Sequence, residues 1–169
     1  MIVVIFGVSG AGKTTVGKLL AQELGWQFIE ADDFHPETNV EKMRSGQALT
    51  DNERWPWLER LRDQIERSLA AGKNVVLACS ALKRKYRDVL RVNSDVTFVF
   101  LRGDHALIAE QLRHRRRHFM NPDLLQTQFA DLEEPKPEED VVTIDLGRTP
   151  QEIVEEVKMK LRLAHKNSS

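Results

Sequence analysis

The stretch Gly7-Val8-Ser9-Gly10-Ala11-Gly12-Lys13-Thr14 decides the fold expected of this chain. It matches the pattern G-x-x-x-x-G-K-[ST] at every fixed position. An apolar run over residues 2–6 precedes it, and an amphipathic pattern over residues 13–24 follows and stops at Gly25. The glycines let backbone N–H groups turn toward phosphate oxygens, and the helix N-terminus adds partial positive charge. The stretch therefore predicts a strand, a phosphate-cradling loop and a helix.

Each residue type in this loop has an expected task. Lys13 is expected to reach the β- and γ-phosphates of a nucleoside triphosphate, and the Thr14 hydroxyl to hold Mg²⁺. The residues expected to contact the nucleotide are Gly7, Ser9, Gly10, Ala11, Gly12, Lys13, Thr14 and Thr15. The alternative is a glycine-rich turn that binds nothing, and the strand before it and the helix after it argue against that alternative.

Four more apolar runs alternate with helical patterns along the chain. The runs cover residues 27–31, 74–79, 96–101 and 141–145, and the helical patterns cover residues 51–71, 104–118 and 149–165. Short runs rich in β-branched and aromatic residues indicate strands that are buried on both faces. Their alternation with helices predicts a parallel sheet covered on both sides. We expect an α/β fold of three αβα layers, with five parallel strands in a single domain over residues 1–169.

Local signals add detail to this expectation. Asp51 is the expected N-cap of the second helix, and Pro150 suits the first turn of the last one. The stretch 133–140, with two prolines and five acids, is expected to be a surface loop. Trp57 is expected in the core.

Composition narrows the possible functions. The 169 residues contain 25 Lys and Arg against 26 Asp and Glu, and this balance argues against a nucleic-acid partner. With 41% apolar and 30% charged residues, the chain is typical of a globular protein. The single cysteine, Cys79, excludes an intrachain disulfide, fits a reducing compartment, and is expected to be a small buried residue. The opening run is too short for a bilayer span and lacks signal-peptide flanks. These features predict a cytoplasmic protein with no membrane partner.

Acidic residues follow the second predicted strand, in Glu30-Ala31-Asp32-Asp33. In an open parallel sheet, ligands bind beyond the carboxyl ends of the strands, so this segment should face the same crevice as the phosphate loop. A carboxylate there can accept a proton from an acceptor hydroxyl. The alternative is an acidic turn that caps the next helix. We favour the catalytic role for Asp32, and both roles stay open for Glu30 and Asp33.

Four further side chains are candidates for the site. His35 could bind polar groups of the substrate or only close a turn. Arg54 could pair with an anionic group in a bidentate fork, or form a surface salt bridge with a neighbouring acid. Lys83 and Arg87 follow the third strand at the same sheet edge, where they would add positive charge unless they lie on a solvated helix face.

The densest basic run is Arg113-His114-Arg115-Arg116-Arg117-His118. Over a γ-phosphate, such arginines stabilise transition-state charge and exclude water. We therefore expect a mobile helical lid over about residues 113–130. A nucleic-acid patch is disfavoured because the whole chain is not basic. A zinc site built on His114 and His118 is disfavoured because the arginines repel a dication and no third ligand is apparent.

Three classes of nucleotide-binding protein remain possible: a small-molecule kinase, a GTPase switch or ATPase motor, and a non-catalytic binding module. A guanine-specific Asn-Lys-x-Asp stretch is missing from the sequence. The third predicted strand ends in Cys79-Ser80, without the acid that motor ATPases place there. Both observations favour a small-molecule kinase, and a nucleotide-gated binding module stays the alternative outside the enzymes.

Several blocks together point to one family. Besides the phosphate loop they are Asp32-Asp33-Phe34-His35-Pro36, Arg54-Trp55-Pro56-Trp57-Leu58, Cys79-Ser80-Ala81-Leu82-Lys83 and His118-Phe119-Met120. With these blocks the chain resembles, over nearly its whole length, the gluconokinases, P-loop kinases that phosphorylate D-gluconate at its 6-hydroxyl. The resemblance implies a nucleoside-monophosphate-kinase-like fold, ATP and Mg²⁺ as cofactors, D-gluconate as the substrate, and a homodimer.

The resemblance also implies roles for individual residues. By position, Asp32 looks like the family's acid near the acceptor hydroxyl, and Arg115 looks like a lid arginine. Glu30-Ala31-Asp32 stands where the family usually has Asp-Gly-Asp. The catalytic residues are then expected to be Lys13, Asp32 and Arg115, and the residues at the substrate to be Asp32, His35, Arg54 and Lys83. A shikimate-kinase-like or other small-metabolite kinase is the alternative, although the Gly-Gly-Gly loop usual in shikimate kinases is not found.

Overall fold

The computed structural model describes residues 1–114 and 122–163. Its centre is one sheet of five parallel strands in the order β2-β3-β1-β4-β5. The strands are β1 (Ile2–Phe6), β2 (Gln27–Glu30), β3 (Val75–Cys79), β4 (Val96–Arg102) and β5 (Val141–Asp145). The central strand β1 is paired on both sides, so that Val4 lies opposite Leu77 of β3 and Phe98 of β4. The predicted five-stranded parallel sheet is confirmed.

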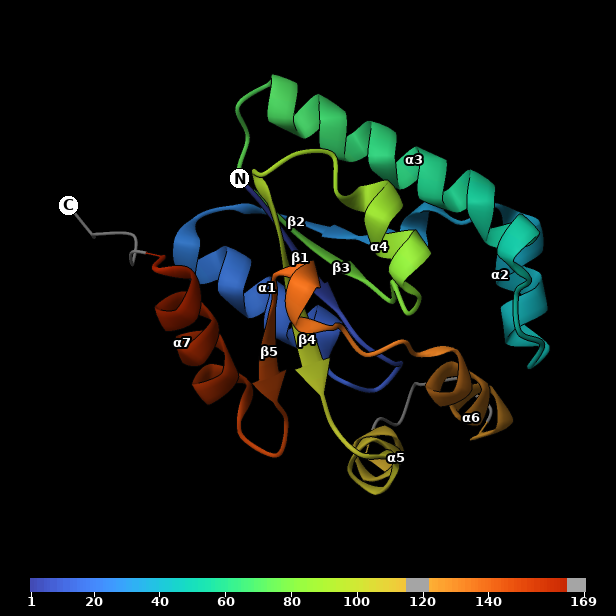
Figure 1. Cartoon of the computed structure of the whole chain (residues 1–169). Coiled ribbons are helices and arrows are strands. Elements are labelled where there is room, and N and C mark those ends of the chain that lie inside the picture. Colours follow the sequence, from blue (N-terminus) through green and yellow to red (C-terminus); the bar gives the residue numbers. More distant parts are fainter. Residues whose placement is uncertain (115–121, 164–169) are drawn as a thin grey trace.

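Helices cover both faces of this sheet (Figure 1). The helices α1 (Lys13–Leu24) and α7 (Pro150–Leu161) pack on one face, and α3 (Asp51–Ala70) and α4 (Arg84–Leu90) pack on the other. Successive side chains of β1 alternate between two cores: Val3 and Ile5 join α1 and α7, whereas Val4 and Phe6 join α3 and α4. A strand buried on both faces must be apolar at every position. The three predicted αβα layers are confirmed.

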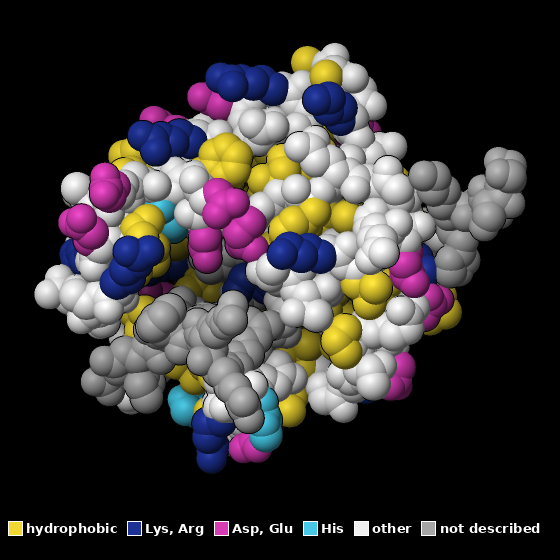
Figure 2. Space-filling model, turned by 180° about the vertical axis from the view of Figure 1, so that it is seen from behind, with side chains coloured by type: hydrophobic (Ala, Val, Ile, Leu, Met, Phe, Trp, Pro, Cys, Tyr) yellow, Lys and Arg dark blue, Asp and Glu magenta, His cyan; other side chains and the backbone are white. Residues whose placement is uncertain are grey.

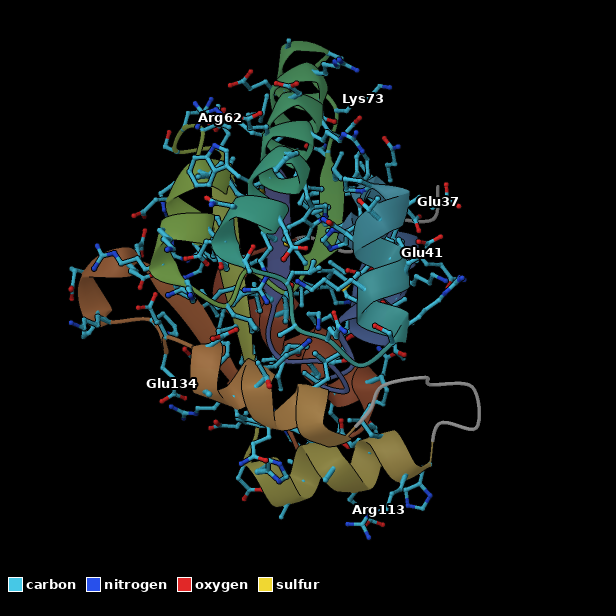
Figure 3. All side chains as sticks on the ribbon, turned by 90° about the vertical axis from the view of Figure 1, so that its right-hand side faces the viewer. Glu37, Glu41, Arg62, Lys73, Arg113 and Glu134 are labelled. Carbon is cyan, nitrogen blue, oxygen red and sulfur yellow. The ribbon has the colours of Figure 1, made fainter. Side chains whose placement is uncertain are left out.

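The other elements lie toward the carboxyl ends of the strands. They are the 3₁₀ turn Ala31–Phe34 and the helices α2 (Glu37–Arg44), α5 (His105–Arg113) and α6 (Pro122–Asp131). A second 3₁₀ turn, Pro137–Glu139, lies instead at the amino end of β5, which it directly precedes. Helices α5 and α6 contact each other beyond the end of β4 (Figures 1 and 3). Over residues 1–114 and 122–163, no helix has the length and apolar character needed to cross a bilayer.

The start of α3 differs from the prediction. Its N-cap is Thr50, whose hydroxyl accepts from the Glu53 backbone N–H, while the Glu53 carboxylate accepts from the Thr50 backbone N–H. This reciprocal capping box satisfies two of the N–H groups that a helix start leaves unpaired. Asp51, the predicted cap, is instead the first helical residue, and its carboxylate binds side chains of α4 and the loop before it.

Arg87 and the acidic stretch 133–140 also differ from the predictions. Arg87 does not lie on a solvated helix face, because its side chain is fully buried. It donates two hydrogen bonds to the Glu139 carboxylate and three to the carbonyls of Ala81, Leu82 and Glu133. The stretch expected as a surface loop is therefore anchored on α4 by a buried ion pair.

Candidate active site

The phosphate loop connects β1 to α1 and needs glycine at two of its positions. Gly10 and Gly12 have φ angles of +85° and +91°, the left-handed region in which side chains are strained. A Cβ atom on Gly10 would lie 2.6 Å from the Cγ atom of Leu112 in α5. Gly12 is the N-cap of α1, so the loop runs directly into the helix N-terminus. This backbone is a cradle that side chains would fill or distort.

The loop orients both its lysine and its amides. The Lys13 Nζ atom lies 3.0 Å from the carbonyl oxygens of Gly7 and of Val8 and donates to both, so the ammonium is held against the loop. The backbone N–H of Ser9 donates to the Gln128 Oε1 atom of α6 over 2.6 Å. An oxygen from outside the loop thus binds an amide of the cradle. The loop presents an N–H group to an oxygen ligand, as phosphate binding requires.

Glu30, at the end of β2, contacts the start of α1. The Thr14 hydroxyl donates to the Glu30 Oε2 atom over 2.5 Å. Burial raises the pKa of Glu30, although the bond from Thr14 opposes this shift. Because the Thr14 hydroxyl proton is engaged, the lone pairs of its oxygen are left for a cation. The structure thus brings Glu30 to the phosphate loop.

These oxygen donors fit Mg²⁺, a hard cation that keeps several waters and takes few protein ligands. Within residues 1–114 and 122–163, no three His, Cys, Asp or Glu side chains cluster as a metal site. A divalent ion here would therefore rely on the Thr14 hydroxyl together with phosphate oxygens and water.

A cavity of about 150 Å³ opens beside the loop. Its polar lining is Ser9, Lys13, Asp32, His35, Arg54, Ser80, Thr127 and Gln128, and its apolar lining is Met43, Ala48, Leu49, Trp57, Leu82 and Leu124. Four of the predicted site residues, Lys13, Asp32, His35 and Arg54, therefore surround one space. In the view from behind, acidic side chains gather near the middle of the face with Lys and Arg side chains around them (Figure 2).

His35 is held on several sides. Its ring stacks on the indole of Trp57, with centroids 4.2 Å apart and planes 14° apart. Its Nδ1 atom lies 3.3 Å from the Nδ2 atom of Asn39 in α2. Burial lowers the pKa of His35 to about 4, with Arg54 acting in the same direction and Asp32 against it. The ring is therefore neutral near pH 7, and its role at the substrate stays a prediction.

Arg54 reaches across to α4 and α6. Its Nη1 atom donates to the Tyr86 hydroxyl over 2.9 Å and lies 3.6 Å from the Asp131 Oδ2 atom. Its guanidinium also lies over the Tyr86 ring, 5.5 Å from the centroid. Its partners come from other elements, and not from the neighbouring acids of α3 that the alternative interpretation required. Arg54 is thus a positive charge in the cavity wall, positioned by a tyrosine.

Lys83 stands apart from the other candidates. Its Nζ atom lies 3.1 Å from the Asp51 Oδ1 atom. The Lys85 ammonium and the Tyr86 hydroxyl bind the same carboxylate, and these bonds from Lys85, Tyr86 and Lys83 hold the pKa of Asp51 well below its usual range. Lys83 is not among the described residues that line the cavity. Its role at the substrate stays a prediction.

Only part of the expected lid lies within the described residues. Arg115 is outside them. Arg113 and His114 are exposed at the end of α5, beside Glu110, and Arg113 points away from the sheet (Figure 3). Helix α6 supplies Leu124, Thr127 and Gln128 to the cavity wall.

Sequence reasoning did not identify Thr127, Gln128 and Ser80 as residues that line the cavity. Ser80 follows β3 at the carboxyl ends of the strands, where ligands bind, and that position could have identified it as a site residue. Polar residues on a short amphipathic helix such as α6 carry no comparable signal. Cys79 is buried, and burial raises the pKa of its thiol to about 12, so the prediction of a small buried residue is confirmed.

The central strand of this parallel sheet runs into a phosphate loop, and a small polar cavity lies at the carboxyl ends of the strands. This is the architecture of P-loop kinases that act on small molecules. Known proteins agree with this class. The family model described as shikimate kinase matches residues 9–162.

The relatives narrow the class further. A "Probable gluconokinase" of Xenopus tropicalis is 43% identical over 94% of this chain and 92% of its own length. A "Gluconokinase" of Gluconobacter oxydans is 44% identical over 91% of this chain and 87% of its own. The crystal structure of a gluconokinase from Sinorhizobium meliloti superposes with a TM-score of 0.86, at 44% identity, over 98% of this chain and 93% of that one. The chain belongs to the gluconokinase family of P-loop kinases.

Proposed function

We propose that this chain catalyses ATP + D-gluconate → ADP + 6-phospho-D-gluconate. The observation that carries the proposal is that Lys13 of the phosphate loop and Asp32 line the same cavity, so that a triphosphate and an alcohol can meet between them. The gluconokinase relatives support the choice of acceptor. A shikimate-kinase-like activity is not favoured, because the relatives from Xenopus tropicalis and Gluconobacter oxydans, at 43% and 44% identity, are named gluconokinases.

The transfer needs a base and a neutralised triphosphate. Asp32 accepts the proton of the 6-hydroxyl as its oxygen attacks the γ-phosphorus, and the bond from that phosphorus to the bridging oxygen of ADP breaks. The loop amides and Lys13 hold the β- and γ-phosphates. Little covalent chemistry falls to the protein, so positioning and charge neutralisation provide most of the acceleration.

We assign the Mg²⁺ site to the Thr14 hydroxyl, with Glu30 orienting that hydroxyl through their hydrogen bond. When bound there, Mg²⁺ would supply positive charge that neutralises the charge developing on the phosphate oxygens. Glu30 replaces the family's usual Asp at this position, and the longer side chain reaches Thr14 directly.

Arg54 and His35 are the proposed contacts for the sugar acid. The ion pair of Arg54 with Asp131 is long, at 3.6 Å, and a substrate carboxylate could replace it with a bidentate pair. Lys83 would have to leave Asp51 to reach the substrate. Arg115 is proposed as the lid arginine that reaches the γ-phosphate.

An assay of ADP release distinguishes the candidate activities. We expect release with D-gluconate and little with other sugar acids, shikimate or nucleoside monophosphates; faster release with shikimate would overturn the proposal. Asp32→Asn should lower kcat by about 10² or more if Asp32 is the base. Asp33→Asn is the matched control, because Asp33 is exposed and does not line the cavity. A mild effect of Asp32→Asn would leave Asp32 only a positioning role.

We also propose that the enzyme is a cytoplasmic homodimer. The single buried cysteine and the family resemblance support this assignment. Light scattering of the purified chain measures the oligomeric state directly.

A further inference from the structure

The orientation of the Asn39 amide is determined by its backbone partner. Its Nδ2 atom lies 2.9 Å from the Glu53 carbonyl oxygen, which can only accept a hydrogen bond. The NH₂ end of the amide is therefore identified by chemistry. Helix α2 presents Glu37 and Glu41 to solvent (Figure 3), whereas Asn39, on its other side, is only 4% exposed.

The same NH₂ group faces the ring of His35. The Nδ2 atom of Asn39 lies 3.3 Å from the Nδ1 atom of His35. An amide NH₂ group has two protons to donate and accepts nothing, so Nδ1 must be the acceptor. A neutral imidazole that accepts at Nδ1 carries its proton on Nε2. Burial, which lowers the pKa of His35 to about 4, keeps the ring in this neutral form.

The parts that hold this arrangement are themselves fixed. The indole N–H of Trp57 donates to the Ala31 carbonyl over 2.7 Å, so the surface on which His35 stacks cannot rotate freely. Glu53, whose carbonyl anchors Asn39, is tied by its carboxylate to Lys42 of α2 over 2.6 Å. The imidazole plane and the Asn39 amide are thus set from two helices.

We propose that Asn39 is a positioning residue that holds His35 in its Nε2–H tautomer, so that His35 donates a hydrogen bond from Nε2 to an oxygen of the sugar acid. The inference rests on the proposed function for its substrate part. A histidine in this tautomer offers the cavity a donor and no base, which leaves proton abstraction to Asp32. It recognises carboxylate or hydroxyl oxygens and offers nothing to a substrate group that must itself donate.

Nitrogen NMR of the ¹⁵N-labelled full chain tests the tautomer without any substrate. The chain has five histidines, and the His35 signals are assigned by their loss in His35→Gln. We expect a protonated Nε2 and a bare Nδ1 in the unmodified protein. In Asn39→Leu, the two nitrogen signals should move toward each other as the tautomers mix. A protonated Nδ1 in the unmodified protein would overturn the inference, whatever the enzyme's activity.

Kinetics test whether Asn39 acts through His35. Asn39→Leu should raise the KM for D-gluconate about threefold to tenfold, the value of one neutral hydrogen bond, and leave the KM for ATP unchanged. In the His35→Gln background, the same change should have no further effect. Asn52→Leu, at an exposed position of α3, is the matched control. If Asn39→Leu raised the KM for D-gluconate equally in both backgrounds, Asn39 would act on the structure and not through His35, and the positioning role would be overturned. If NMR shows the expected tautomer but the protein does not phosphorylate gluconate, the substrate part of the inference is overturned together with the proposed function.

Discussion

Replacing Glu139 by Gln should destabilise the protein far more than the loss of one charge suggests. All five N–H groups of Arg87 are engaged. The Nε and one Nη2 proton go to the two Glu139 oxygens, over 2.8 and 2.9 Å, and the other three go to backbone carbonyls over 2.9–3.0 Å. The glutamine side chain of the variant would offer one acceptor oxygen and turn its own NH₂ group toward a guanidinium N–H.

The size of the effect follows from burial. The Arg87 side chain is 0% exposed and that of Glu139 is 4% exposed, so the variant leaves a cation uncompensated away from water. Breaking a buried pair by removing one partner costs about 3–5 kcal/mol. For a chain of this length each kcal/mol lowers Tm by about 2–4 °C, so we expect a Tm lower by about 6–20 °C.

Urea unfolding followed by circular dichroism measures the free energy of unfolding. Glu66→Gln is the matched control, because Glu66 pairs with Arg62 at the surface, where both side chains are more than 40% exposed. Such a pair contributes about 0.5 kcal/mol or less. If Glu139→Gln cost no more than Glu66→Gln, the burial argument would be refuted.

A second prediction for Glu139 concerns how the free energy of unfolding changes with pH, and in which direction. Burial would raise the pKa of Glu139, but the hydrogen bonds and charge of Arg87 outweigh it and bring the pKa below the ordinary 4.5. The stabilisation is thus fully present above the unfolded-state value and is lost as pH falls through the folded-state pKa. Glu139→Gln should therefore flatten the acid side of a stability-against-pH curve, and an unchanged slope would contradict the assignment.

Two further predictions concern the site. Gly10→Ala should weaken ATP binding more than Gly12→Ala. Both residues have positive φ, so either substitution introduces about 1–2 kcal/mol of backbone strain. Only at Gly10 would the new Cβ also meet a side chain of α5, at 2.6 Å. Calorimetric titration with ATP compares them, and equal losses would contradict the argument. Tyr86→Phe removes the hydroxyl that accepts from Arg54, and should raise the KM for gluconate about threefold to tenfold at unchanged kcat. An effect on kcat alone in steady-state assays would place Arg54 away from the substrate.

Elements whose signal is local could be predicted from the sequence. The central strand Ile2–Phe6 is apolar at every position because both faces are covered, and its expected bounds agree with the structure. The phosphate loop is a contiguous motif, and the edge-of-sheet argument placed Asp32 beside Lys13 because parallel strands all end at one side. Helices α2 and α4, of eight and seven residues, are too short to show a period and were not predicted.

Contacts between distant segments could not be predicted in the same way. Arg87 and Glu139 are 52 residues apart, and each alone is indistinguishable from a surface charge. Asn39 precedes its partner Glu53 by 14 residues, across a loop whose path no local pattern specifies. The side chains that support the site could thus not be predicted, because their positions depend on tertiary packing. The candidate residues for the chemistry could be predicted, because they lie at strand ends or within the phosphate-loop motif.

The bond from the Ser9 amide to Gln128 connects the phosphate cradle to α6. A partly buried N–H without a partner would be costly, and the neutral amide oxygen of α6 satisfies it over 2.6 Å. A phosphate oxygen at the same N–H makes a charge-assisted bond, roughly twice as strong as a neutral one. Gln128 and a phosphate oxygen would therefore compete for this amide, and the charge-assisted bond favours the phosphate. Because Gln128 lies on the same helix as Asp131, the partner of Arg54, the phosphate loop and the proposed carboxylate site both contact α6.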